Sequence, residues 1–181
     1  MIYVEAPAPY TPGPRDGPSI FLAGGITGCE DWQSRARELL GDAPIVLFNP
    51  RRAAYDFERG DALAEQVAWE YRHLQQADLT LFWFPACDPR VTVQPITLFE
   101  LGSAVAEARL RGRRLTVGAD PRYPRRLDVE RQLHHALPGE QLYDTLQDTV
   151  AAGLSVSCRV PYSCSPGRAW CSCRSTAWRR G

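Results

Sequence analysis

Residues 79–102 read LTLFWFPACDPRVTVQPITLFELG, and this stretch decides the fold. The nearly continuous apolar run from Leu79 to Phe84 is typical of a strand buried on both faces of a parallel sheet. The apolar spacing after Thr97 is that of an amphipathic helix. The stretch therefore predicts a strand followed by a helix, with Glu100 in the first helical turn beyond the carboxyl end of the strand. In open α/β sheets, ligands bind at that edge.

The same alternation of apolar strands and amphipathic helices continues on both sides of this stretch. It predicts an α/β protein whose parallel sheet is covered by helices on both faces. A flavodoxin-like doubly wound sheet with strand order 2-1-3-4-5 is the first choice among such folds. The expected strands are 19–23, 45–48, 79–84, 114–118 and a weak one near 141–142, and the expected helices are 31–40, 62–76, 97–111, 127–136 and 143–154. In the helix over 62–76, the residues expected to face the core are Leu63, Val67, Leu74 and either Ala68 or Trp69.

Composition indicates one folded domain with two irregular ends. The chain has 181 residues, of which 44% are hydrophobic, which suffices for one sizeable core. Residues 1–18 are rich in proline and glycine and predict an extended N-terminal arm. Residues 19–154 form the expected α/β domain, and residues 155–181 an irregular, disordered tail rich in Cys, Arg and Ser. The cysteine spacings in this tail match no zinc finger or ribbon, so no metal and no cofactor is expected.

Charge and hydropathy exclude several classes of partner. The 21 basic residues balance the 21 acidic ones, so no overall charge attracts nucleic acid or an anionic membrane. No segment approaches the ~20 apolar residues of a membrane-spanning helix, and the first residues lack the pattern of a signal peptide. We expect a soluble, cytoplasmic protein without a nucleic-acid or membrane partner.

The acidic residues allow a functional and an ordinary interpretation. Thr97-x-x-Glu100 is the pattern of a capping box, in which the glutamate only accepts a backbone hydrogen bond at the helix start. Alternatively, the helix dipole keeps Glu100 ionised, as a nucleophile must be. Glu70 and Asp78 are the candidate partner acids, because two carboxylates ~5 Å apart permit glycosidic displacement with retention. Glu70 could equally be a solvated helix residue, and Asp78 a loop cap.

The candidate substrate-binding residues lie near the same edge. Gly24 and Gly25 follow the first expected strand, where backbone N–H groups can approach a sugar or an anion. A tight strand-to-helix connection would need glycine as well. The other candidates are Ile26, Trp32 as a stacking surface, Asn49, Arg51 as a partner of phosphate, and the aromatic residues Tyr55 and Phe84.

Six short segments occur in a characteristic order: IFLAGGI (20–26), EDWQ (30–33), FNPRR (48–52), QVAWE (66–70), ADLTLFWFP (77–85) and PITLFELG (95–102). Together they resemble the nucleoside 2-deoxyribosyltransferase-like family over residues 19–135. The resemblance implies a doubly wound domain that forms homo-oligomers, with sites completed by a neighbouring subunit. It also implies that Glu100 attacks C1′ of a 2′-deoxynucleoside, that Glu70 helps to protonate the departing base, and that Gly24 and Gly25 lie beneath the sugar.

The leading hypothesis is therefore an enzyme that cleaves the N-glycosidic bond of a 2′-deoxynucleoside through a covalent glycosyl-glutamate intermediate. A second base or water then accepts the sugar. One alternative is a nucleoside 5′-monophosphate N-glycosidase, motivated by the glycine turn and by Arg51 and Arg52. Another is a non-catalytic nucleotide-binding module, motivated by the abrupt change of composition in the tail.

Overall fold

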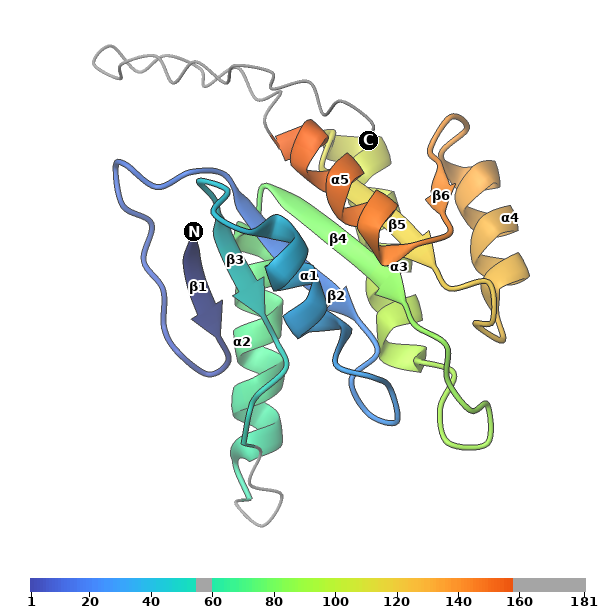
Figure 1. Ribbon diagram of the computed structural model, residues 1–181, viewed down its shortest axis with the longest axis horizontal. Coiled ribbons are helices and arrows are strands. Elements are labelled where there is room, and N and C mark those ends of the chain that lie inside the picture. The colour runs from blue at the N-terminus through green and yellow to red at the C-terminus, as the bar shows by residue number, and fades with distance from the viewer. Residues whose placement is uncertain (55–59, 158–181) are drawn as a thin grey trace, which may run out of the picture.

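A computed structural model describes residues 1–54 and 60–157 of the chain (Figure 1). In these residues, six parallel strands form one sheet in the order β1-β3-β2-β4-β5-β6. The strands are β1 (Ile2–Glu5), β2 (Ser19–Gly24), β3 (Val46–Asn49), β4 (Leu79–Phe84), β5 (Arg114–Ala119) and β6 (Leu142–Tyr143). The helices are α1 (Trp32–Leu40), α2 (Ala62–Gln76), α3 (Pro95–Arg111), α4 (Arg126–Ala136) and α5 (Leu146–Ser157).

The predicted flavodoxin-like α/β fold is confirmed. When β1 is set aside, the five remaining strands have the predicted order 2-1-3-4-5. Helices α1 and α5 cover one face of the sheet, and α2, α3 and α4 cover the other (Figure 1). Strand β4 contributes to both apolar layers: Trp83 packs on the α1 side, and Phe82 and Phe84 pack on the α2 side. None of the described helices has both the length and the apolar character needed to cross a membrane.

The N-terminal arm is part of the fold, which its composition did not predict. Strand β1 pairs in parallel with β3 along its whole length and forms one edge of the sheet. Beyond β1, the indole N–H of Trp69 donates to the carbonyl of Ala8 at 2.7 Å, and the ring of Tyr10 packs on Phe48. This strand was not predicted, because it has only four residues in a segment that is rich in proline and glycine overall. A strand this short suffices at the edge of a sheet.

Helix α2 buries Trp69 as predicted, at 5% exposure, but part of its predicted core face lies in solvent. Leu63 and Val67 are exposed by 69% and 55%, so the prediction that they face the core is wrong. The buried face instead includes the polar residues Gln66 and His73, whose side chains bond to backbone carbonyls within the core layer. Leu74 does pack against this layer. The prediction failed because it took the spacing of the aliphatic residues Leu63 and Val67 as the core face, whereas both lie in solvent.

The C-terminal boundary also differs from the predicted one. Helix α5 continues to Ser157, which is buried at 2% exposure, so the helix extends beyond the domain end expected at residue 154. The remaining tail, with its four cysteines, lies outside the described residues.

Asp78 ties the amino ends of two central strands together. Its Oδ2 atom accepts hydrogen bonds from the backbone N–H of Ser19 at 2.7 Å and from the Ser19 hydroxyl at 2.8 Å. All strands are parallel, so this edge is opposite to the one that precedes α3. The length of β4 alone separates the two edges by about 17 Å. The structure does not support the catalytic role predicted for Asp78, because its carboxylate is bonded to Ser19 at the amino edge, and Glu70 is the described residue whose charge acts on Glu100.

We predict that Asp78→Ala lowers the free energy of unfolding by about 1 to 2 kcal/mol, since Ser19 loses its acceptor. Activity per folded molecule is expected to stay unchanged. Urea unfolding and initial rates measure the two effects, with Asp42→Ala in the exposed turn after α1 as the control. A large loss of activity without a loss of stability would restore a catalytic role for Asp78.

Candidate active site

The turn after β2 is packed so closely that it requires glycine. A Cβ atom on Gly24 would lie 2.2 Å from the carbonyl oxygen of Trp83 and 2.5 Å from Cζ2 of Trp32. A Cβ atom on Gly25 would lie 2.6 Å from the side-chain amide carbon of Gln94. The indole N–H of Trp32 donates to the Gly25 carbonyl at 2.9 Å. The ordinary reason for two glycines, tight packing, therefore applies at this turn.

Gln94 fixes the turn to the start of α3. Its side-chain oxygen accepts the backbone N–H of Gly25 at 3.1 Å, and its amide nitrogen donates to the carbonyl of Pro85 at 3.0 Å. The Gly25 N–H thus already has an acceptor in the free protein. It does not point to an open site for an anion, in contrast to the prediction. Gln94 was not among the site residues predicted from the sequence. A residue that precedes proline is expected to be extended, whereas Gln94 adopts a left-handed conformation with φ 55°.

Helix α3 begins at Pro95, which places Glu100 in the second helical turn. The N-cap residue is Gln94, and it makes no side-chain capping bond. Thr97 lies inside the first turn and is buried at 4% exposure. The capping-box interpretation of Thr97 and Glu100 is therefore wrong, and the carboxylate of Glu100 has no structural task at the helix end.

Glu100 and Glu70 come from neighbouring helices on the same face of the sheet, and both are partly buried. Burial, and after it the negative charge of Glu70, raises the pKa of Glu100 to about 8. Burial also raises the pKa of Glu70, although the hydrogen bond from Gln66 and the charge of Arg52 oppose the rise. The helix dipole was expected to keep Glu100 ionised. Burial beside a second carboxylate outweighs it, because the dipole effect falls off within the first turn.

A short chain of polar contacts holds Glu70 in place. The amide nitrogen of Gln66 donates to Glu70 at 2.7 Å and to the carbonyl of Pro50 at 2.7 Å. The amide oxygen of Gln66 accepts the Nε–H of Arg52, whose guanidinium also pairs with Glu65 at 3.1 Å. Glu70 is therefore a fixed, partly buried carboxylate rather than a solvated helix residue.

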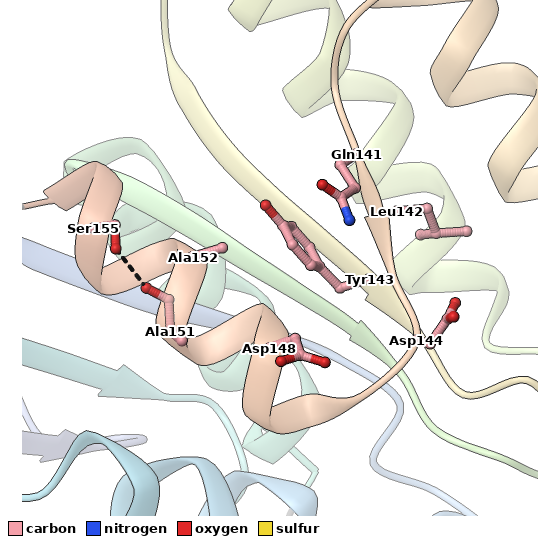
Figure 2. Close-up of a pocket in the computed structure, with 8 residues that line it drawn as sticks. All are labelled: Gln141, Leu142, Tyr143, Asp144, Asp148, Ala151, Ala152 and Ser155. Carbon is pink, nitrogen blue, oxygen red and sulfur yellow. Dashed lines mark hydrogen bonds between the residues drawn. The ribbon is translucent and has the colours of Figure 1, made fainter. Parts of the chain in front are cut away.

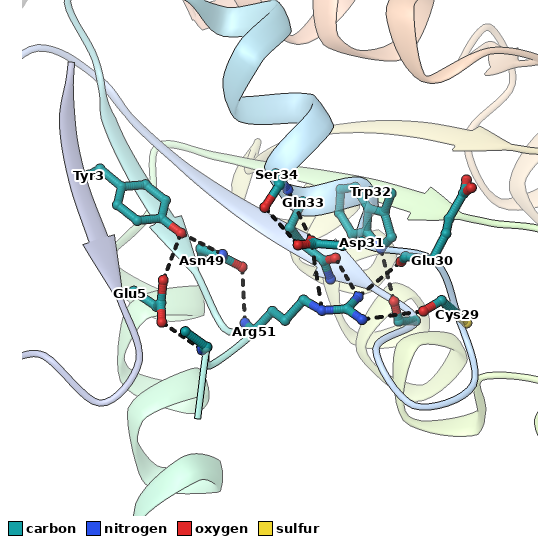
Figure 3. A network of polar contacts seen from close by, with 12 residues as sticks. Tyr3, Glu5, Cys29, Glu30, Asp31, Trp32, Gln33, Ser34, Asn49 and Arg51 are labelled. Atoms are coloured by element: carbon teal, nitrogen blue, oxygen red, sulfur yellow. Dashed lines mark hydrogen bonds and ion pairs between the residues drawn. The ribbon is translucent and has the colours of Figure 1, made fainter. Parts of the chain in front are cut away.

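Asn49 and Arg51, the polar residues at the end of β3 that were predicted to bind substrate, instead form hydrogen bonds within the protein (Figure 3). The side-chain oxygen of Asn49 accepts the backbone N–H of Arg51 at 3.0 Å, and its nitrogen donates to the hydroxyl of Tyr3 at 2.7 Å. The guanidinium of Arg51 donates to the carbonyls of Glu30 at 2.9 Å and Cys29 at 3.3 Å. Asn49 and Arg51 thus fasten the loop before α1 to strands β1 and β3.

The predicted aromatic walls are interior residues. Trp32 is exposed by 1%, and Phe84 is fully buried against Tyr123, with ring centroids 5.0 Å apart. Neither ring presents an open face on which a base could stack, so that prediction is corrected. Ile26 is half-buried in the turn after β2, and Tyr55 lies outside the described residues.

Of the predicted features, Glu70 and Glu100 lie within electrostatic reach of each other, and the Gly24–Gly25 turn is bonded to Gln94 at the start of the helix that carries Glu100. A comparison with curated proteins gave no match. The family model described as nucleoside 2-deoxyribosyltransferase like matches residues 17–111, which include the turn and both glutamates. On this match over more than half of its length, the chain belongs to the nucleoside 2-deoxyribosyltransferase-like family.

Proposed function

We propose that the protein cleaves the N-glycosidic bond of a 2′-deoxynucleoside, with Glu100 as the nucleophile and Glu70 as the general acid. The observation that carries this proposal is the pair of partly buried carboxylates, Glu70 and Glu100, from neighbouring helices on one face of the sheet, with raised pKa values. Perturbed carboxylates at the carboxyl edge of such a sheet are typical of catalytic groups.

The raised pKa values supply the proton that the reaction needs. Two like charges buried together resist simultaneous ionisation, so the pair holds one proton at neutral pH. The higher pKa of Glu100 places this proton mainly on Glu100 in the resting pair. The reactive form is the one in which the proton lies on Glu70, so that the ionised Glu100 attacks C1′ of the sugar while Glu70 protonates the departing base. A second base then accepts the sugar from the glutamyl ester in a transferase, and water accepts it in a hydrolase.

The contacts of Arg51 and Arg52 favour a nucleoside over its 5′-monophosphate. Both guanidinium groups are engaged by protein acceptors in the described structure: Arg51 by loop carbonyls and Arg52 by Gln66 and Glu65. A phosphate would have to displace these contacts. The monophosphate N-glycosidase is therefore the second candidate, and the non-catalytic binding module is the third.

An apolar surface beside Glu100 supports the proposal of a homo-oligomer. Five large apolar side chains on α2 and α3 are each exposed by at least 65%. Leu110 lies near the end of α3, and the other four are called here the α2/α3 stripe: Leu63, Tyr71, Ile96 and Phe99. Large exposed apolar patches mark interaction surfaces. We infer that a second copy of the chain covers the α2/α3 stripe and encloses the space around Glu100.

We predict that Glu100→Gln lowers kcat/KM for the preferred deoxynucleoside by at least about 1000-fold, because an amide cannot form the ester. Glu107→Gln, two turns further along α3, is the matched control and is expected to keep its activity. Chromatography of the products from a panel of deoxynucleosides, with and without a free base, gives the rates. Full activity of Glu100→Gln would contradict the covalent mechanism.

The pH profile tests the shared proton. We expect kcat/KM of the unmutated protein to fall above pH about 8, where the pair loses its proton. Glu70→Gln removes the like charge, so the pKa of Glu100 falls and Glu100 ionises at lower pH. The variant is expected to lose the alkaline decline and to be about 100- to 10,000-fold slower. An alkaline decline that persists unchanged in Glu70→Gln would show that the two carboxylates are not coupled.

Phosphate preference separates the first two candidate functions. We expect the deoxynucleoside to be turned over at least about tenfold faster than its 5′-monophosphate, since a phosphate would meet arginines that are already paired. Initial rates at equal concentration measure the ratio, and a ratio that favours the monophosphate would establish the second candidate.

The oligomer is tested at the α2/α3 stripe. We predict that Phe99→Asp converts the protein to a monomer, because a carboxylate in an apolar interface is costly to bury. Leu127→Asp, at an apolar position on α4 that is exposed by 57% and lies outside the stripe, is expected to leave the assembly intact. Light scattering after size-exclusion chromatography measures the mass. A monomeric unmutated protein would remove this part of the proposal.

A further inference from the structure

A cavity of about 470 Å³ opens at the carboxyl ends of β4, β5 and β6. It is called here the Trp83 cavity. Its volume is that of a site for a small organic molecule, and its position is the edge where such sheets bind ligands. The residues that line it are Trp83, Asp120, Pro121, Arg122, Asp144, Thr145 and Leu146.

The Trp83 cavity is separate from the candidate active site. Trp83 and Leu146 belong to the apolar layer beneath α1 and α5. Glu100 lies on α3, which covers the opposite face of the sheet and packs there through Leu101. A ligand in the Trp83 cavity would therefore be divided from Glu100 by the sheet edge.

The indole of Trp83 has an unused hydrogen-bond donor. The side chain is exposed by only 3%, and its Nε1 atom has no acceptor among the described residues. A buried donor without a partner is costly, and such groups in folded proteins call for an explanation. An acceptor atom of a bound molecule would satisfy it.

One carboxylate at the rim has a free oxygen. Both oxygens of Asp120 accept hydrogen bonds from Arg122. In Asp144, by contrast, Oδ1 pairs with Arg126, and no partner of Oδ2 lies among the described residues. Asp144 stands at the turn between β6 and α5, where it also borders a second cavity of about 400 Å³ (Figure 2). The Trp83 cavity thus offers the unused donor of Trp83, the unused acceptor of Asp144 and the apolar side chains of Pro121 and Leu146.

We propose that the Trp83 cavity binds an amino-substituted nucleobase or a heterocycle of the same kind. A ring nitrogen would accept the Trp83 N–H, and the exocyclic amino group would donate to Asp144. Pro121 and Leu146 would pack against the flat ring. Asp120 and Asp144 are paired with Arg122 and Arg126, so these ion pairs leave no net positive charge to attract a phosphate. The proposal does not depend on catalysis by Glu100.

Equilibrium dialysis with Glu100→Gln, which removes turnover, tests the site. Adenine and cytosine are expected to bind, and hypoxanthine and uracil, in which a carbonyl replaces the amino group, at least about tenfold more weakly. Adenosine 5′-monophosphate is expected to bind more weakly than adenine. Trp83→Phe and Asp144→Ala, each introduced into Glu100→Gln, should lower the affinity for adenine about tenfold, whereas Asp42→Ala should not.

Two results would overturn the proposal. One is the absence of binding by any of these bases at concentrations of about 5 mM. The other is binding that neither Trp83→Phe nor Asp144→Ala weakens, because the base would then lie elsewhere, for example beside Glu100. Asp144 is exposed on a turn, so its variant stays informative if Trp83→Phe fails to fold. Loss of glycosidic activity in Glu100→Gln bears only on the proposed function, so the two proposals can fail independently.

Discussion

The side-chain amide of Gln94 joins the glycine turn after β2 to the end of β4 and to the first residue of α3, and the geometry of the candidate site depends on this contact. Because Gln94 is also the N-cap residue of α3, the residue that closes the turn stands at the start of the helix that carries Glu100. Gly24 and Gly25 are needed because any side chain there would collide with Trp83, Trp32 or Gln94. The turn is thus a packed structural joint between β2 and α3.

The chemistry of the site follows from burying two carboxylates side by side. Glu100 has no capping task and no cationic partner among its described contacts, and burial beside Glu70 raises its pKa to about 8. Gln66 and Arg52 hold Glu70 in place and partly offset the same effect there. This arrangement destabilises a doubly ionised pair, which is the property that glycosidic cleavage by one nucleophile and one acid requires.

The sequence predicted the fold better than it predicted the site, and the reasons are physical. The apolar strands follow from the periodicity of the sequence, and their order follows from the alternation of strands and helices. Residues 79–102 already contain one strand and the start of the helix that follows it. In contrast, the fates of Asp78 and Trp32 depend on tertiary packing. Asp78 lies at the wrong edge of the sheet, and Trp32 is an interior residue. Gln94 was missed because its left-handed backbone contradicts the usual preference of a residue before proline.

The central claim is that Glu100 carries the sugar during the reaction. Its most direct test is mass spectrometry of the protein after rapid mixing with a deoxynucleoside and acid quenching, followed by peptide mapping. The account predicts an added mass of one deoxyribosyl group on the peptide that contains Glu100, and none in Glu100→Gln. Release of free base by the unmutated protein without any such adduct, or with an adduct on another residue, would contradict it.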